Sequence, residues 1–251
     1  MTRVLFVAFV LSACLTSAIH ADIPCFCDFS DFTFTESDNT RPAVLVPGGI
    51  EITGTGGGEK RSLFYNEKQD ITAFTAEFTF QVSDGRTDFD FHPWTTFVIH
   101  DNPIGVNASD PRGLSKSSAV LFQLSGGDDS DTAFFTGGAS AGQASTSPLN
   151  LQTHNPIDVS LTYDGSILNQ RMVDSVTGDT FEQSYLVDLE EELGSPSGYV
   201  GFIAASTNDT SHRQIISDFK FAAVPEPASC MLAVIGILPF LTCRKRRLRG
   251  S

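Results

Sequence analysis

The chain has 251 residues, of which 30 are acidic and 16 are basic, so its formal net charge is −14 at pH 7. Basic residues gather in its two ends, at Arg3, Arg244, Lys245, Arg246, Arg247 and Arg249, which leaves the middle of the chain still more acidic. A surface of this sign repels nucleic acid, whose recognition needs a basic patch, and it favours solubility and cation binding.

The first 21 residues have the pattern of a secretory signal peptide. Arg3 precedes an apolar run from Val4 to Leu11, and small residues follow as far as Ala21. A signal peptide is removed on export, so residues 1–21 are excluded from the fold. One alternative stays open: Leu11-Ser12-Ala13-Cys14 resembles a lipobox, which would place a lipid on Cys14.

Residues 22–223 predict one all-β domain, because short apolar runs alternate with turns rich in Gly and Asp. The clearest strand is Phe74–Val82, where apolar and polar residues alternate as in a half-buried strand. Phenylalanine, with 21 copies, is expected to dominate the core. Further strands are expected at Phe29–Phe34 on an edge, Ala43–Val46, Gly49–Thr53, Thr96–Ile99, Ala119–Leu124, Phe134–Phe135, Ile157–Tyr163, Asn169–Val173 and Tyr199–Ala205, with turns at Ser83–Gly85, Asp164–Gly165 and Thr177–Asp179.

Two cysteines, Cys25 and Cys27, belong to this predicted mature domain. A disulfide between them would be strained by its small ring, so pairing between copies, a free thiol pair and an incidental pair all stay open.

The last segment, 224–251, has three parts in a fixed order. Val224-Pro225-Glu226-Pro227 comes first, and an uncharged apolar run from Ala228 to Cys243 follows. The chain then carries a basic cluster of Arg244, Lys245, Arg246, Arg247 and Arg249. This order predicts a single, short transmembrane helix with a cytoplasmic basic end, and a buried core helix is the alternative.

These three parts resemble the PEP-CTERM sorting signal of bacteria that make extracellular polymer. The resemblance implies export, recognition and removal of the segment by an exosortase, and only transient anchoring in the inner membrane. The mature protein is then expected at the cell surface or in the extracellular matrix.

A second resemblance, to the legume-type (L-type) lectins, spans most of 28–221 and implies a concanavalin A-like jelly roll. It is carried by segments in a fixed order, of which Gly198–Ala205 is the most specific: Ala76–Val82, Thr96–His100, Gly113-Leu114, Ser118–Phe122, Ile157–Gly165, Val187–Leu189, Gly198–Ala205, His212 and Ile215–Phe221. The binding residues depart from the family pattern. Pro93-Trp94 stand where the family has Asp-Gly, and Leu121 and Gln123 stand where it has its metal-holding Glu and Asp. The family's paired metal site is therefore expected to be absent, while the sandwich persists.

An acidic loop offers a relocated metal site. Asp128, Asp129 and Asp131 follow Gly126-Gly127, and three neighbouring carboxylates repel one another unless a cation lies among them. Calcium is the cofactor that such a loop would take, and a solvated acidic loop is the alternative.

The single tryptophan offers a carbohydrate site. Trp94, with His92, His100, Asp88 and Asp90, could form an aromatic platform for the apolar face of a sugar, with carboxylates accepting hydrogen bonds from its hydroxyls. The alternative is a tryptophan packed at the edge of a sheet.

Three further motifs are given structural interpretations. Gly54–Gly58 with Lys60 lacks P-loop spacing and predicts a mobile turn. Gly138–Gly142 matches a nucleophile elbow in spelling, but no helix pattern follows it, so a flexible loop is expected. Glu190–Glu192 lacks the alternating carboxylates of a glycosidase and predicts a charged turn.

Together these patterns predict an exported, non-enzymatic protein with a lectin-like domain that contacts extracellular polysaccharide. A structural matrix or envelope protein without a ligand site is the main alternative, and a glycan-active hydrolase is a weaker one. The expected partners are the export machinery, an exosortase-type enzyme, the inner membrane for a time and polysaccharide, but no nucleic acid.

Overall fold

The computed structural model describes residues 23, 30–36, 43–55, 58–85, 93–103, 110–124, 130–206 and 212–224. Strands make up most of this part of the chain, with a 3-10 helix at Pro111–Gly113 and one short α-helix, α2, at Leu189–Leu193. The strands are β1 (Phe32–Glu36), β2 (Val44–Val46), β3 (Gly49–Thr53), β4 (Lys60–Tyr65), β5 (Gln69–Asp70), β6 (Phe74–Gly85), β7 (Trp94–His100), β8 (Ser117–Leu124), β9 (Ser130–Thr136), β10 (Ala139–Ser145), β11 (Ile157–Tyr163), β12 (Ile167–Asp174), β13 (Thr180–Leu186), β14 (Ser197–Ala205) and β15 (His212–Ala223).

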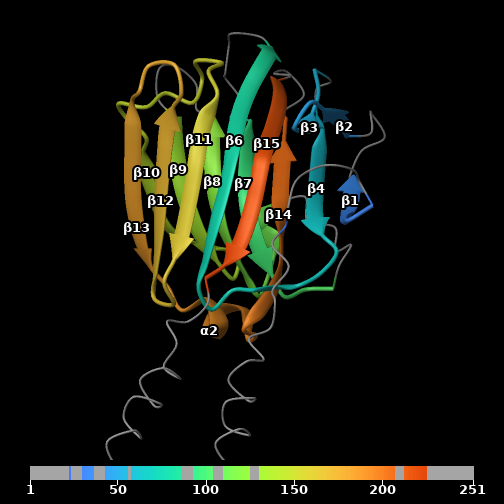
Figure 1. Cartoon of the computed structure of the whole chain (residues 1–251), viewed down its shortest axis with the longest axis vertical. Coiled ribbons are helices and arrows are strands. Elements are labelled where there is room, and N and C mark those ends of the chain that lie inside the picture. The colour runs from blue at the N-terminus through green and yellow to red at the C-terminus, as the bar shows by residue number, and fades with distance from the viewer. Residues whose placement is uncertain are drawn as a thin grey trace, which may run out of the picture. The chain divides into compact units, whose positions relative to one another are not determined.

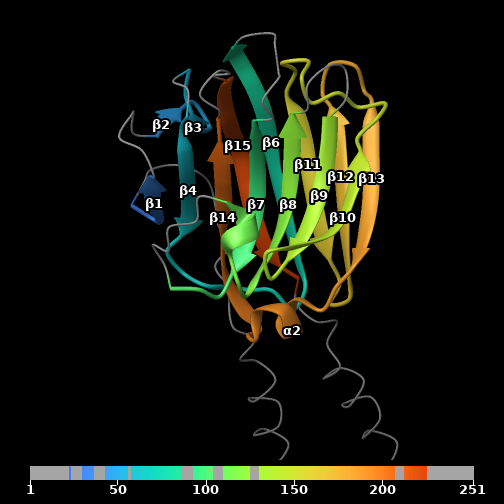
Figure 2. The same ribbon diagram turned by 180° about the vertical axis from the view of Figure 1, so that it is seen from behind.

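The strands form two antiparallel sheets that pack face to face (Figures 1 and 2). The 8-stranded sheet has the order β1-β4-β14-β7-β8-β9-β10, with β5 pairing β14 off this path. The 7-stranded sheet has the order β13-β12-β11-β6-β15-β3-β2. The predicted two-sheet sandwich is thus confirmed, and β1 lies on an edge as expected.

The predicted alternation of β6 is confirmed. Phe74, Ala76, Phe78, Phe80 and Val82 are buried, whereas the residues between them are exposed or half-buried. On one side β6 pairs β11, so that Phe80 faces Ile157 and Phe78 faces Val159 on the inner side of the sheet. Apolar alternation on neighbouring strands in register gives the sheet one continuous inner face.

Phenylalanine rings from both sheets fill the space between them. Phe78 of the 7-stranded sheet meets Phe202 of the 8-stranded sheet edge to face, with ring centroids 5.0 Å apart. Phe202 in turn meets Phe219 at 5.0 Å, and Phe97 lies 5.7 Å from Phe202. Edge-to-face packing of this kind is favourable beyond the area it buries, so the phenylalanine core is confirmed.

Hairpin turns lie at two of the three positions where the sequence predicted them. Between β11 and β12, Gly165 has a φ of 98°, and the Asp164 carboxylate accepts hydrogen bonds from the backbone N–H groups of Ser166 and Ile167. Between β12 and β13, Gly178 has a φ of 79°. The turn expected at Ser83–Gly85 is wrong, because β6 continues through Gly85 and pairs with β15 there.

Two motifs are more ordered than expected. The small-residue segment Gly138–Gly142, expected to be a loop, lies mostly in β10, since it pairs along β9. The Glu190–Glu192 run, expected to be a turn, forms α2 because Asp188 accepts a hydrogen bond from the Glu191 N–H and Gly194 ends the helix in the left-handed conformation.

No helix among the described residues is long and apolar enough to cross a membrane. The predicted signal peptide, and the sorting segment after Val224, lie outside the described residues. Their roles stay predictions.

We expect Phe202→Ala to lower the free energy of unfolding by about 3–5 kcal/mol, because its ring is completely buried among three other rings. Urea unfolding followed by circular dichroism measures the loss. The control Val176→Ala, at a side chain that is 69% exposed, should change stability little. Equal losses in the two variants would contradict this account of the core.

Candidate functional site

The outer face of the 8-stranded sheet carries an apolar layer of its own. Its members are all buried, although an antiparallel sandwich usually leaves this face to solvent. They are Phe64, Val98, Leu114, Ala119, Leu121, Ala133, Phe135 and Ile203. Trp94 and Tyr199 are partly buried and pack against this layer.

Cross-strand register brings three polar or aromatic side chains into one row on this outer face. Trp94 of β7 pairs with Gln123 of β8, and Gln123 pairs with Asp131 of β9. Directly opposed residues project from the same side of a sheet, so the three side chains are neighbours. All three are partly exposed, and we call them the Trp94 row.

Hydrogen bonding orients the acidic end of the Trp94 row. The Gln143 side-chain amide on β10 donates to Asp131 Oδ2 at 3.1 Å. The row therefore offers an aromatic face, a neutral amide and a carboxylate, which are the groups that typically line a saccharide site.

The sequence predicted parts of this row separately. Trp94 was expected in a carbohydrate site and Asp131 in a calcium site, and the structure places them in one row. Asp88, Asp90 and His92 lie outside the described residues, as do Asp128 and Asp129. The structure therefore describes the predicted sugar platform only at Trp94 and His100, and the predicted calcium loop only at Asp131.

His100 does not contribute to the expected aromatic platform. It is completely buried at the opposite end of β7, where its ring meets Phe64 edge-on at 4.3 Å. Its Nδ1 accepts a hydrogen bond from the Asn102 N–H at 3.1 Å, so the ring proton belongs on Nε2. Nε2 has no hydrogen-bond partner within the described residues.

The residues at the lectin-family metal positions do not fit a metal. Leu121 is 7% exposed and belongs to the apolar outer layer, and Gln123 supplies only a neutral oxygen. Among the described residues, no three His, Cys, Asp or Glu side chains gather closely enough to hold an ion. At Leu121, one of the two positions where the resemblance places a metal-holding carboxylate, the structure therefore has apolar packing.

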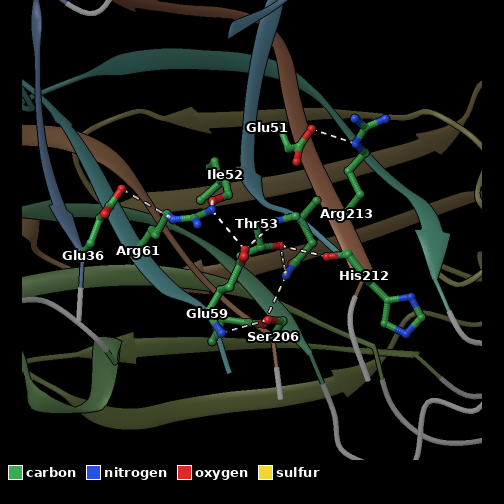
Figure 3. A network of polar contacts seen from close by, with 12 residues as sticks. Glu36, Glu51, Ile52, Thr53, Glu59, Arg61, Ser206, His212 and Arg213 are labelled. Atoms are coloured by element: carbon green, nitrogen blue, oxygen red, sulfur yellow. Dashed lines mark hydrogen bonds and ion pairs between the residues drawn. The ribbon is translucent and has the colours of Figure 1, made fainter. Parts of the chain in front are cut away.

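A buried polar network fixes the end of the sandwich beside the Trp94 row (Figure 3). The Glu59 carboxylate accepts a hydrogen bond from the Gly54 N–H at 2.6 Å and forms an ion pair with Arg61 at 3.1 Å. The Glu59 N–H donates to Ser206 Oγ at 3.1 Å. Both charged residues are nearly inaccessible, with 1% and 3% of their surface exposed.

A second part of this network reaches the neighbours of Trp94. The Gln214 amide donates to Thr53 Oγ1 and to the Ala205 carbonyl, each at 3.0 Å, and Thr95 Oγ1 donates to its oxygen. Thr95 follows Trp94 in β7, and Ala205 is the residue paired with Trp94 across β14. The network therefore holds the backbone on both sides of Trp94.

Sequence reasoning missed Glu59, Arg61 and Gln214. Gly54–Gly58 and Lys60 were interpreted as a mobile turn, and in the described part of this segment Gly54 instead donates to the buried Glu59 carboxylate. The spacing of Glu59 and Arg61 on alternate residues was an available signal, because both then point to one side of the chain.

No protein-family model and no curated protein matches the chain. Several solved structures do match its fold. Arcelin-5, a lectin-like defence protein from Phaseolus vulgaris, superposes with a TM-score of 0.63 at 16% identity, covering 81% of this chain and 97% of its own. Lectin II from Ulex europaeus gives 0.62 at 17% identity, covering 82% and 98%. A lectin from Bauhinia forficata in complex with GalNAc gives 0.64 at 16% identity, covering 82% and 98%.

We expect Arg61→Met to lower the free energy of unfolding by about 3–5 kcal/mol, because it leaves the Glu59 carboxylate buried without its counter-ion. Urea unfolding provides the measurement. Arg112→Met is the matched control: its ion pair with Asp110 is exposed and should be worth about 0–1 kcal/mol. A loss in Arg61→Met no larger than in the control would contradict a structural role for the buried pair.

The pH dependence of the protein's stability should reveal the burial of the His100 ring in its neutral form. Burial lowers its pKa from 6.5 to about 4, so the unfolded chain binds a proton more readily than the folded one between these values. The contribution of His100 to the free energy of unfolding is therefore fully present above pH 6.5. It is lost as the pH falls toward 4, by up to about 3 kcal/mol. Thermal unfolding across this range should show a shallower slope in His100→Asn. An unchanged slope would be inconsistent with a buried neutral His100.

The comparisons with solved lectin structures confirm the predicted fold: the chain has the two-sheet architecture of the legume lectins, the concanavalin A-like jelly roll.

Proposed function

We propose that this chain is a lectin-like protein that binds extracellular polysaccharide through the Trp94 row. The observation that carries the proposal is the register of β7, β8 and β9, which sets an indole beside an amide and a carboxylate on a partly exposed surface. The likeness to lectins, one of them in complex with GalNAc, supports a sugar as the ligand.

The groups of the Trp94 row have complementary tasks. The indole of Trp94 stacks on the apolar face of a pyranose ring. Gln123 offers a carbonyl oxygen and an N–H₂ group to sugar hydroxyls, and Asp131 accepts hydrogen bonds from them. The net charge of −14 disfavours a polyanionic chain, so the ligand class is a neutral polysaccharide.

The described residues of the row support binding rather than glycoside hydrolysis. Hydrolases of sugars place two carboxyl groups across the scissile bond. Among the described residues of the row, Asp131 is the one carboxylate, and it accepts a hydrogen bond from Gln143.

Calcium at Asp128, Asp129 and Asp131 stays a prediction of the sequence. Asp131 lies in β9 and belongs to the Trp94 row, and such a site would not use Leu121. Repeating the binding measurement with a chelator tests it directly.

Export and sorting complete the proposal. The order of the N-terminal apolar run, the Val224–Pro227 motif, the apolar segment and the basic cluster supports passage across the inner membrane, transient anchoring and removal by an exosortase-type enzyme. Mass spectrometry of protein recovered from the producing cell surface tests this, since both ends should be missing.

A structural matrix protein without a ligand site is the second candidate. It is favoured by the replacement of the metal carboxylates with Leu121 and Gln123, since a sandwich kept for its architecture alone has no need of them. A glycan array without any reproducible hit would favour it.

We expect Trp94→Ala to weaken polysaccharide binding by the full-length protein at least about 10-fold, as loss of a stacked aromatic anchor does. A neutral-glycan array followed by calorimetry on its best ligand provides the measurement. Trp94→Phe keeps an aromatic face and should retain most of the affinity, while circular dichroism confirms the fold of both variants. Unaltered binding by a folded Trp94→Ala variant would exclude the Trp94 row as the site.

A further inference from the structure

The Trp94 row continues beyond its members at both ends. On one side, Ser145 of β10 pairs with Asp131 of β9. On the other side, Ala205 of β14 pairs with Trp94, and Lys60 of β4 pairs with Ala205. Directly opposed residues project from the same face of a sheet. We call the whole line, which begins at Lys60 and ends at Ser145, the extended row.

The extended row crosses a large part of the 8-stranded sheet. It runs over β4, β14, β7, β8, β9 and β10, which are consecutive neighbours in that sheet (Figure 2). Neighbouring strands lie about 4.8 Å apart, so the row extends for roughly 24 Å across the strands. β10 is the last strand in the order of this sheet, so the row reaches the sheet's edge there. The row is therefore much longer than one sugar.

Side chains along the extended row are accessible over most of its length. Lys60 and Ser145 at its two ends are exposed, and the members of the Trp94 row between them are partly exposed. Ala205 is 4% exposed, and its methyl group is the shortest side chain of the line. A ligand that passes from Trp94 toward Lys60 therefore crosses a low point between two longer side chains.

The two ends of the extended row add hydrogen-bonding groups. The Ser145 hydroxyl can donate and accept, and the Lys60 ammonium carries three N–H donors. Lys60 interacts electrostatically with the Asp110 carboxylate, and Arg112 donates hydrogen bonds to both oxygens of that carboxylate. With three donors, Lys60 can keep this interaction and also donate to a sugar hydroxyl.

Buried side chains border the extended row on one side. Two residues further along β7, β8 and β9 on the same face are Thr96, Leu121 and Ala133. Each of them is at most 7% exposed. A glycan lying on the row is flanked by covered side chains in that direction, which favours a chain without branches.

We propose that the extended row binds an internal stretch of roughly five sugars in a linear, unbranched polysaccharide that lies across the strands. A pyranose in an extended chain is about as long as one strand spacing, so successive sugars meet successive strands, and one of them stacks on Trp94. The inference rests on the proposed polysaccharide binding. It adds Lys60 and Ser145 as contact residues and has the ligand held along its length rather than by its end.

Chain length tests the inference directly. The full-length protein is titrated by calorimetry with fragments of two to six sugars, prepared by partial hydrolysis of the neutral polysaccharide with the strongest array signal. Affinity should rise by about 2- to 10-fold with each added sugar and level off at about five, because each sugar reaches one more position of the row. Equal affinities for disaccharide and hexasaccharide would overturn the inference and leave binding at Trp94 intact. The absence of any array signal would instead contradict the proposed function and, with it, this inference.

Lys60→Gln tests the end of the row on β4. It should weaken hexasaccharide binding by about 2- to 10-fold and leave disaccharide binding unchanged, because a disaccharide stacked on Trp94 ends before it reaches β4. Lys60→Arg keeps a cationic donor and should retain the hexasaccharide affinity. Lys220→Gln is the matched control, since Lys220 is exposed on β15 of the other sheet. With the fold of each variant confirmed by circular dichroism, an unchanged hexasaccharide affinity in Lys60→Gln, or an equal loss for both fragments, would overturn the assignment.

Discussion

Strand register in the 8-stranded sheet is the constraint on which the rest of the structure depends. With β7, β8 and β9 aligned as they are, the apolar outer side chains gather in one layer and Trp94, Gln123 and Asp131 gather in one row. A slip of one residue would exchange the faces of a whole strand. The Gln214 hydrogen bonds to Thr95 and to the Ala205 carbonyl hold β7 and β14 at the end where Trp94 lies.

The lectin architecture here has apolar packing at a position where the resembled family attaches metal chemistry. Leu121 lies within an apolar layer instead of holding an ion, so the strands that a metal site would brace are braced by packing. The polar groups that remain in the row are neutral or singly acidic. They suit the hydrogen bonding and stacking with a neutral sugar that we propose.

Much of the fold could be predicted from local sequence patterns, but some strands could not. β6 and β11 alternate clearly between buried and exposed residues, so their strands were predicted. β4 was missed because Leu63 and Phe64 are buried on opposite faces and show no alternation. β10 was missed because it consists of small residues and one glutamine, which show no apolar alternation.

The site was predicted only in pieces, for a related reason. The chemical types of Trp94 and Asp131 marked them as candidates, but their adjacency depends on pairing across three strands, which no local pattern specifies. The Glu59–Arg61 pair escaped notice because charged residues are seldom buried, and only the tertiary structure supplies the partners that make their burial tolerable.

Because the chain contains one tryptophan, emission from tryptophan excited selectively over the four tyrosines reports the surroundings of Trp94. The most direct measurement is therefore a titration of the full-length protein with a soluble fragment of a polysaccharide that it retains, followed by tryptophan emission. The account predicts a saturable change in emission intensity or wavelength whose midpoint matches the calorimetric affinity. Binding without any change in tryptophan emission would contradict it.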